Sequence, residues 1–302
     1  MTALATLRIG TRGSTLALAQ TGIVVETLAA AGFAGPMETT TISTRGDAIS
    51  RQRPNGRWEL TDGQFTTELE RQLLSGSVDM VVHSFKDLPT AHDPRLVIGA
   101  VLERADARDC LLTWRGGGLD NLPFGGHVAT SSARRAAQLA ALRPDLIAQP
   151  IRGNVESRMA RLERREFDGL LLAGAGLLRI GVSIPTDALL PFESMLPAPA
   201  QGALAIQVRA DDAALRERLR AVDHLPTRIA VEAERSLLAK IGGGCLAPLG
   251  ALGEVEDGQL RLRAAYETSD GRFIRGEAAG PADDPDAVVQ SVVEALQRGI
   301  AA

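Results

Sequence analysis

The chain has 302 residues, of which 45% are hydrophobic and 23% are charged, a composition typical of soluble globular proteins with two or three domains. A formal net charge of −4 at pH 7 argues against a general nucleic-acid binder, because such proteins are usually basic. Two cysteines, Cys110 and Cys245, form at most one disulfide, which excludes the cysteine framework of small secreted proteins and favours a reducing compartment.

The N-terminal third alternates strand and helix patterns. An early apolar stretch is broken by Gln20, Thr21 and Glu26, so it fits neither a signal peptide nor a membrane span, and we expect a cytoplasmic protein. Strands are expected at 7–11, 37–44, 78–82 and 96–102, and helices at 14–31 and 66–76. Residues 46–64 break every periodicity and predict a long irregular loop, of the length that is typical of functional lids or of disordered segments. The apolar strands predict a parallel sheet covered on both faces.

A second α/β unit is expected over 104–198. Its strands are predicted near 110–114, 127–131, 148–153 and 168–173, and its helices near 133–142 and 155–166. The stretch 197–209 predicts a strand that returns to the first sheet. The sequence therefore predicts two α/β lobes with chain crossovers and a ligand cleft beyond the strand ends, the first lobe comprising 1–103 and 199–221.

Residues 222–302 differ in pattern and predict a smaller C-terminal α+β domain. Thr227 is expected to cap a helix over 228–241, which the glycine run ends. Residues 259–280 read as a hairpin that turns at 269–271, and the last helix carries Val288, Val292 and Leu296 on one stripe.

The segment VHSFKDLP places His83, Ser84, Lys86 and Asp87 directly after an apolar strand. A surface turn with a Lys-Asp pair is the plain alternative. If it lies at the mouth of a cleft, we expect Asp87 to accept hydrogen bonds from ligand N–H groups and to stabilise a developing cation.

Three segments place arginines and hydroxyl groups at expected helix N-termini: TRGS at 11–14, ATSSARR at 129–135 and IRGNVESR at 151–158. Helix N-termini attract anions and arginine binds carboxylates through two hydrogen bonds. One such segment alone is equally consistent with a solvated helix face. Together they favour a ligand with several carboxylates; phosphate stays an alternative, although no P-loop motif is present.

Cys245 follows three glycines in AKIGGGCLAPLG. No spacing supports a metal site, and no local signature supports a Cys-His nucleophile. A buried structural thiol is a better interpretation for Cys110 than for Cys245. The three glycines before Cys245 favour exposure and close approach of the backbone over packing. Covalent attachment of a group is the remaining interpretation.

These motifs resemble the porphobilinogen deaminase, or hydroxymethylbilane synthase, family of tetrapyrrole biosynthesis, from RIGTRGSTLALAQ through VVHSFKDLPT and PAPAQGALAIQ to GGGCLAPLG. The resemblance implies two periplasmic-binding-protein-like α/β lobes and a third domain with the cysteine loop. It implies a transferase in which Cys245 holds a dipyrromethane cofactor by a thioether. Four porphobilinogen units are joined to this primer, and the linear tetrapyrrole is released by hydrolysis.

The resemblance also implies roles for matched positions, with Asp87 as the catalytic aspartate and no metal. The cofactor-binding residues are expected to be Ser84, Lys86, Asp87, Thr130, Ser132, Arg134, Arg135, Arg152, Gly153, Arg158 and Cys245. The substrate-binding residues are expected to be Arg12, Ser14, Phe65, Arg152, Arg158, Arg179 and Gln201.

Three positions depart from the family pattern: Asp62 replaces a loop lysine, Ala200 a glycine, and Gln207 a glutamate. The first leaves the loop without an expected cationic contact, and the last leaves any acidic role there in doubt. The expected partner is the small-molecule substrate, with no nucleic acid, no membrane and a monomeric chain. The alternatives are a two-lobed binding protein for a small polycarboxylate, or an inactive paralogue.

Overall fold

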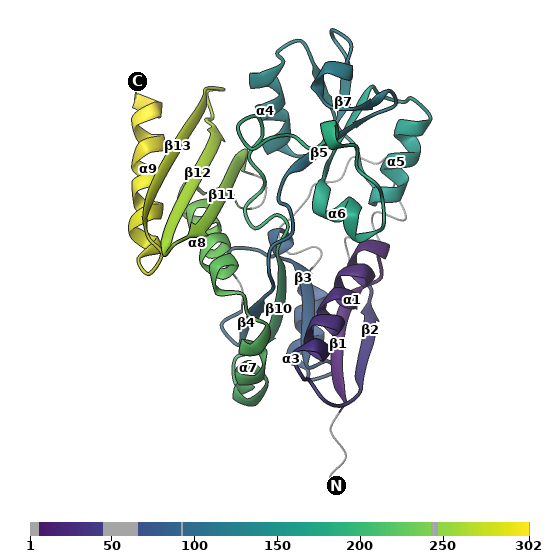
Figure 1. The fold of residues 1–302 in the computed structure, drawn as a ribbon, viewed down its shortest axis with the longest axis vertical. Helices are drawn as coiled ribbons and strands as arrows, with labels where there is room; N and C mark the ends of the chain where they lie inside the picture. The colour runs from purple at the N-terminus through teal and green to yellow at the C-terminus, as the bar shows by residue number, and fades with distance from the viewer. Residues whose placement is uncertain (1–5, 45–65, 92, 243, 245–246, 302) are drawn as a thin grey trace. The chain divides into compact units, whose positions relative to one another are not determined.

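The computed structural model describes residues 6–44, 66–91, 93–242, 244 and 247–301, in the order of elements that Figure 1 shows. Asp62, Phe65 and Cys245 lie outside the described residues, as does the loop predicted at 46–64. The chain divides into two compact units. Unit 1 is Met1–Arg104 with Ala203–Arg228, and unit 2 is Ala105–Gly202 with Ile229–Ala302. A separate C-terminal domain stays a prediction.

Unit 1 is built on a five-stranded sheet in the order β2-β1-β3-β10-β4. The strands are β1 (Leu7–Arg12), β2 (Met37–Ile42), β3 (Met80–Ser84), β4 (Leu96–Val101) and β10 (Leu204–Arg209). β1 is parallel to β2 and β3, whereas β10 is antiparallel to both β3 and β4. The predicted return of 197–209 to the first sheet is confirmed. The four predicted N-terminal strands do run in one direction, but the sheet as a whole is mixed, because the returning strand β10 is antiparallel to both of its neighbours.

Helices cover both faces of the unit 1 sheet. They are α1 (Thr15–Ala30), α3 (Thr67–Leu74) and α7 (Ala213–Leu219), with 3₁₀ turns η1 (Phe85–Asp87) and η4 (Arg220–Val222). Val24 and Leu28 of α1 and Leu219 of α7 share one core cluster with β-strand residues. Leu69 and Leu73 of α3 belong to the cluster on the other face. Two-sided burial explains why the inner strands β3 and β10 are almost entirely buried.

Unit 2 repeats this architecture with a sheet in the order β6-β5-β9-β7-β8. The strands are β5 (Asp109–Thr113), β6 (Gly116–Gly117), β7 (His127–Ala129), β8 (Ile147–Gln149) and β9 (Gly169–Ala173). The helical elements are η2 (Leu119–Asn121), α4 (Ala133–Leu142), α5 (Val155–Glu163), α6 (Gly174–Arg179) and η3 (Thr186–Ala188). β7 is parallel to β8 and β9, and β5 is antiparallel to β9. Each sheet thus has four strands that run in one direction and one antiparallel strand, β10 or β5, that follows a crossover.

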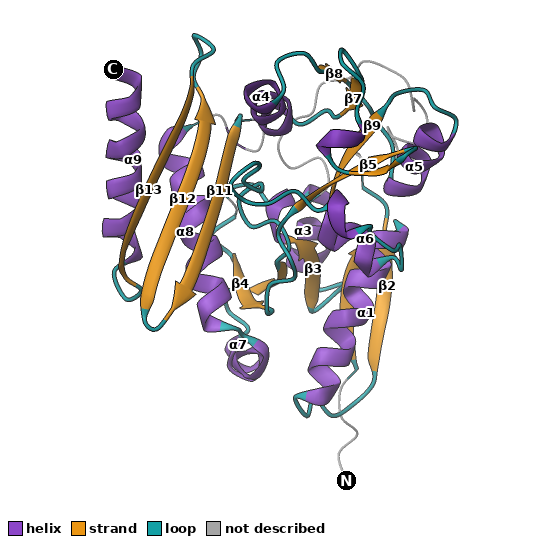
Figure 2. Cartoon of the chain, turned by 45° about the horizontal axis from the view of Figure 1, so that its top comes forward, coloured by secondary structure: helices purple, strands orange, loops and turns teal. Residues whose placement is uncertain are grey.

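The C-terminal part of unit 2 is an antiparallel sheet with two helices, drawn together in Figure 2. Its elements are α8 (Leu225–Ile241), β11 (Leu249–Glu256), β12 (Gln259–Glu267), β13 (Phe273–Pro281) and α9 (Pro285–Ala301). The predicted hairpin is confirmed by the β12–β13 register, and Val288, Val292 and Leu296 are buried as predicted. The fold class predicted from the sequence, two similar α/β lobes with a smaller α+β part, is confirmed.

The predicted cap of α8 is wrong. The helix begins at Leu225, so Thr227 lies in its first turn. The His224 Nδ1 atom accepts from the Thr227 N–H at 3.3 Å and contacts the Thr227 hydroxyl at 2.8 Å. Imidazole therefore takes the place of the expected hydroxyl cap, a substitution that favoured cap residue types do not suggest. Among the described helices, none is both long enough and apolar enough to span a bilayer.

Candidate active site

Unit 1 brings its predicted site residues to one edge of its sheet. Arg12 ends β1 and Ser14 caps α1, while Ser84 ends β3 and Lys86 and Asp87 lie in η1. Because β1 and β3 are parallel neighbours, their carboxyl ends meet at the same edge. Asp87 is exposed, as a carboxylate that receives a ligand from solvent must be. Its part in catalysis stays a prediction.

The two hydroxyl groups of this edge already have partners in the chain. Ser14 Oγ accepts from the Ala17 N–H at 3.2 Å, which fixes the start of α1. Ser84 Oγ accepts from Gln20 Nε2 at 2.8 Å and donates to Gln20 Oε1 at 3.0 Å. Gln20, which the sequence reading did not select, thus ties α1 to the end of β3.

A series of polar contacts runs from the buried His83, next to Ser84, to the half-buried Glu70. His83 Nε2 contacts Gln207 Oε1 at 3.0 Å, and Gln207 Nε2 donates to Glu70 Oε1 of α3 at 3.1 Å. Since the Gln207 amide donates to Glu70, its oxygen accepts from His83, which assigns the proton of the neutral ring to Nε2. Burial lowers the pKa of His83 to about 4. Gln207 therefore serves as a neutral bridge between histidine and carboxylate.

Unit 2 presents a second set of predicted residues at the carboxyl ends of β7 and β8. Thr130 and Ser132 follow β7, where Ser132 Oγ accepts from the Arg135 N–H at 3.4 Å at the start of α4. Arg152 and Gly153 follow β8 and precede α5. Gly153 has φ +111°, and a Cβ there would lie 2.2 Å from Ser157 Oγ, so this turn requires glycine.

Arginines gather near these helix starts. Burial lowers the pKa of Arg158 to about 10, and the positive charges of Arg135 and Arg152 add to this effect. Like charges held close together favour an anionic ligand that relieves their repulsion. Arg158 Nε donates to the Gly153 carbonyl at 2.7 Å, which leaves the rest of its guanidinium for such a ligand. Arg179 ends α6, where burial lowers its pKa to about 10 and Nη2 donates to the Gly202 carbonyl at 2.6 Å.

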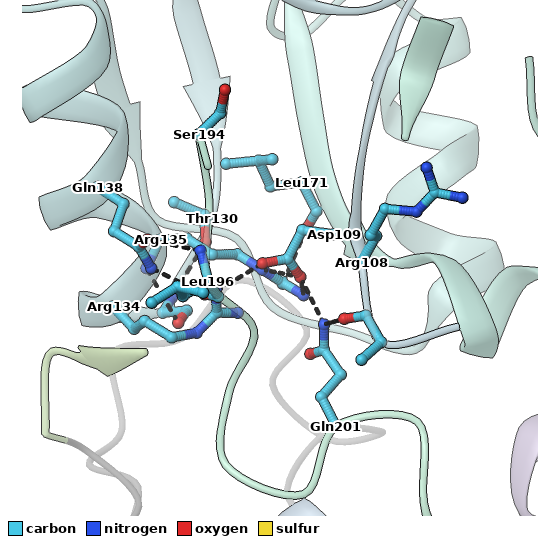
Figure 3. A network of polar contacts seen from close by, with 12 residues as sticks. Arg108, Asp109, Thr130, Arg134, Arg135, Gln138, Leu171, Ser194, Leu196 and Gln201 are labelled. Carbon is cyan, nitrogen blue, oxygen red and sulfur yellow. Dashed lines mark hydrogen bonds and ion pairs between the residues drawn. The ribbon is translucent and has the colours of Figure 1, made fainter. Parts of the chain in front are cut away.

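Arg134 and Arg135 enter a buried network centred on Asp109, shown in Figure 3. Asp109 is 0% exposed; its Oδ2 accepts from Arg134 Nη1 at 2.5 Å, and its Oδ1 accepts from Arg135 Nη2 at 2.7 Å. Gln201 Nε2 also donates to Oδ1, at 2.9 Å. Burial by itself raises the pKa of Asp109, but the two guanidinium groups outweigh it and hold the pKa well below its usual range.

This network gives the arginine pair structural duties beside any role in binding. Arg134 Nη1 also donates to the Leu196 carbonyl at 2.7 Å, and Arg135 Nη1 donates to the Leu171 carbonyl at 3.0 Å. Their cofactor contacts, and a substrate contact of Gln201, stay predictions. Asp109 itself was missed, because an aspartate at the start of an apolar strand carries no motif. Two adjacent arginines in a helix that packs against the sheet need a buried counter-charge, and this need was the one sign in the sequence that could have pointed to Asp109.

The turn that carries Gln201 has an unusual residue at its third position. The Gln201 N–H donates to the Ala198 carbonyl at 2.9 Å, with Pro199 second and Ala200 third at φ +60°. Proline followed by a positive φ is the type II pattern, whose third position favours glycine. Ala200 is 0% exposed and its N–H donates to Glu234 Oε2 at 2.6 Å. This hydrogen bond, made to a charged group, offsets the strain of the left-handed alanine.

We expect Ala200→Gly to raise the free energy of unfolding by up to about 1 kcal/mol. Removing the left-handed alanine relieves about 1–2 kcal/mol of strain. The larger backbone entropy that glycine loses on folding offsets about 0.5–1 kcal/mol of this gain. Urea denaturation at neutral pH measures the difference. A lower free energy of unfolding in the variant would show that packing of the Ala200 methyl group stabilises the protein by more than the backbone strain destabilises it.

Comparisons with known proteins agree with this arrangement. The family description "Porphobilinogen deaminase, dipyromethane cofactor binding domain" matches residues 7–217, and "Porphobilinogen deaminase, C-terminal domain" matches residues 228–298. The chain belongs to the porphobilinogen deaminase family. Its fold class and the motif-based resemblance are thereby confirmed, and dipyrromethane is the cofactor of this family.

Porphobilinogen deaminases from several bacteria are similar over nearly the whole chain. The protein from Desulforudis audaxviator is 45% identical, over 96% of this chain and 94% of the relative. The protein from Nocardia farcinica is 47% identical, over 93% of this chain and 81% of the relative. The protein from Thermus thermophilus is 45% identical, over 92% of this chain and 91% of the relative.

The side chains of unit 2 fit a dipyrromethane, which carries acidic arms. Arg135, Arg152 and Arg158 supply positive charge beside the starts of α4 and α5, where the unpaired N–H groups of a helix also favour anions. The donor set is cationic throughout and suits carboxylates.

Proposed function

We propose that this chain is a hydroxymethylbilane synthase, which deaminates four porphobilinogen molecules and joins them head to tail on a dipyrromethane held by Cys245. The proposal is supported above all by the family match over 7–217 and 228–298. The arginine cluster of unit 2 and the polar edge of unit 1 supply the two kinds of group that the reaction needs. One kind binds carboxylates, and the other stabilises positive charge on pyrrole nitrogens.

Each candidate residue has a task that follows from its chemistry. Arg152 and Arg158 bind acidic arms through guanidinium hydrogen bonds, and Arg12 and Lys86 provide cations at the unit 1 edge. Asp87 accepts hydrogen bonds from pyrrole N–H groups and stabilises the positive charge that develops as ammonia leaves the substrate. When bound, the dipyrromethane supplies the pyrrole carbon that forms the new carbon–carbon bond.

Intact-mass measurement of the chain, produced in cells that make porphobilinogen, tests the covalent step. We expect an added mass that matches two linked pyrrole units, and we expect Cys245→Ser to remove it. Cys110→Ser is the matched control, since Cys110 is buried in β5 and burial raises the pKa of its thiol to about 12, which leaves it unreactive. An unmodified wild-type chain would favour a binding protein, and a modified chain without turnover would favour an inactive paralogue.

We also propose a monomeric chain, because no segment of the sequence has a coiled-coil pattern, and a cytoplasmic location, which the cysteine usage supports. Sedimentation equilibrium of the loaded protein measures the first point, and fractionation of the source cells the second.

A further inference from the structure

Glu234 of α8 is a buried carboxylate that accepts hydrogen bonds from two backbone N–H groups far apart in the sequence. It is 0% exposed; Oε2 accepts from the Ala200 N–H at 2.6 Å, and Oε1 accepts from the Gly253 N–H of β11 at 2.7 Å. A charge inside a protein is costly unless hydrogen bonds hold it. Each oxygen accepts from a backbone N–H, so the side chain helps to fix two main-chain positions.

One of those positions is the turn before Gln201. Ala200 has the left-handed φ of +60°, and its hydrogen bond to Glu234 holds the N–H in that orientation. Gln201 follows at once, and its Nε2 donates to the Ala107 carbonyl at 2.8 Å and to Asp109 Oδ1 at 2.9 Å. A change in the turn therefore moves the amide that contacts Asp109.

The same Asp109 oxygen serves Arg135. Oδ1 accepts from Arg135 Nε at 3.1 Å and Nη2 at 2.7 Å, in addition to Gln201. Three donors on one oxygen restrict where each can lie. The contacts form an unbroken series from α8 through the 198–201 turn to the first turn of α4, and every member belongs to unit 2.

We propose that Glu234 is a positioning residue for the arginine pair, which it aligns through the Ala200 turn, Gln201 and Asp109. The inference rests on the proposed function only in assuming that Arg134 and Arg135 help to hold acidic arms. It adds a physical link between the helix that precedes the cysteine loop and the helix whose first turn carries the arginines.

A purely structural role for Glu234 is the competing explanation, since Gly253 ties it to the C-terminal sheet. The two explanations differ in what happens at Arg135. Structural anchoring predicts lower stability with an unchanged arginine environment, whereas the proposed link predicts a changed environment even where the protein stays folded.

The test is side-chain NMR of ¹⁵N-arginine-labelled protein, with the Arg135 Nε–H resonance identified by its loss in Arg135→Lys. We expect Glu234→Gln to shift this resonance, because the neutral amide presents N–H groups to a backbone donor and releases the turn. We expect Gln201→Leu to shift the resonance as well. The double variant Glu234→Gln/Gln201→Leu should show no larger shift than Gln201→Leu alone, because both changes act through the same contact. Glu163→Gln, at an exposed glutamate of α5, is the matched control.

Steady-state kinetics give a second, independent measurement. We expect KM for porphobilinogen to rise on the order of 10-fold in Glu234→Gln, as misplaced positioning groups can cost up to about 10²-fold. Glu234→Asp is a second variant should Glu234→Gln fail to fold: it keeps the charge, is one methylene shorter and should shift the resonance less. An unmoved Arg135 resonance in either folded variant overturns the link. A wild type without the dipyrrole mass would instead count against the proposed function.

Discussion

Asp87→Asn is expected to lower the turnover of porphobilinogen by on the order of 10²–10³, the effect of losing one preorganised stabilising group. Asparagine keeps the shape of the side chain and removes the negative charge, so positive charge on the pyrrole nitrogens loses its electrostatic partner. Asp87 is exposed at the end of η1, and the substitution should leave the free energy of unfolding within about 0.5 kcal/mol of wild type. The measurement is kcat under saturating substrate, with loading checked by intact mass.

Asp211→Asn is the matched control, because Asp211 is another exposed aspartate of unit 1, beyond the end of β10. It should retain wild-type kcat. Near-normal turnover in Asp87→Asn, in a fully loaded and folded protein, would remove Asp87 from the mechanism and leave the polar edge of unit 1 with a binding role only.

The parts of the fold that were predictable are those encoded by local pattern. Helix 133–142 matches α4, because Ser132 caps it and the apolar residues recur at helical spacing. The short α6 and α7 were missed, since elements of six and seven residues hold too few turns to show a period. The strand direction of β10 was also beyond local pattern: an apolar run reads the same in either direction, and its partners are set by long-range contacts.

The candidate site divides in the same way. Motifs predict Asp87, Arg152 and Arg158 as site residues because helix starts and strand ends are visible in sequence. Gln20 and Glu234, which hold neighbouring parts of the chain in place, lie inside helices, where a polar side chain looks like part of a solvated face. Only tertiary contacts show that Gln20 binds Ser84 and that Glu234 binds the turn at Ala200.

Asp109→Asn is expected to lower the free energy of unfolding by about 3–5 kcal/mol, the range found when one partner of a buried ion pair is removed. Arg134 and Arg135 are 3% and 8% exposed, so the substitution leaves two guanidinium groups inside the protein without their counter-charge. Urea denaturation at pH 7 measures the loss. A domain stability of about 5–15 kcal/mol leaves the variant folded enough to study. Asp283→Asn, at an exposed aspartate of the same unit, should change little.

The pH dependence identifies the charge as the cause. The folded-state pKa of Asp109 lies below the unfolded value of about 3.9. Its contribution is therefore complete above that value and is lost as pH falls toward the folded pKa. Wild type should lose this contribution below about pH 4, whereas Asp109→Asn, having no carboxyl there, should show a flatter decline.

Adding Arg134→Gln to Asp109→Asn should cost less than the sum of the two single changes, because the second removes a charge that the first left unpaired. Additive losses, or a pH profile equal to wild type, would mean that Asp109 stabilises the fold through shape and not as the counter-ion of the arginine pair.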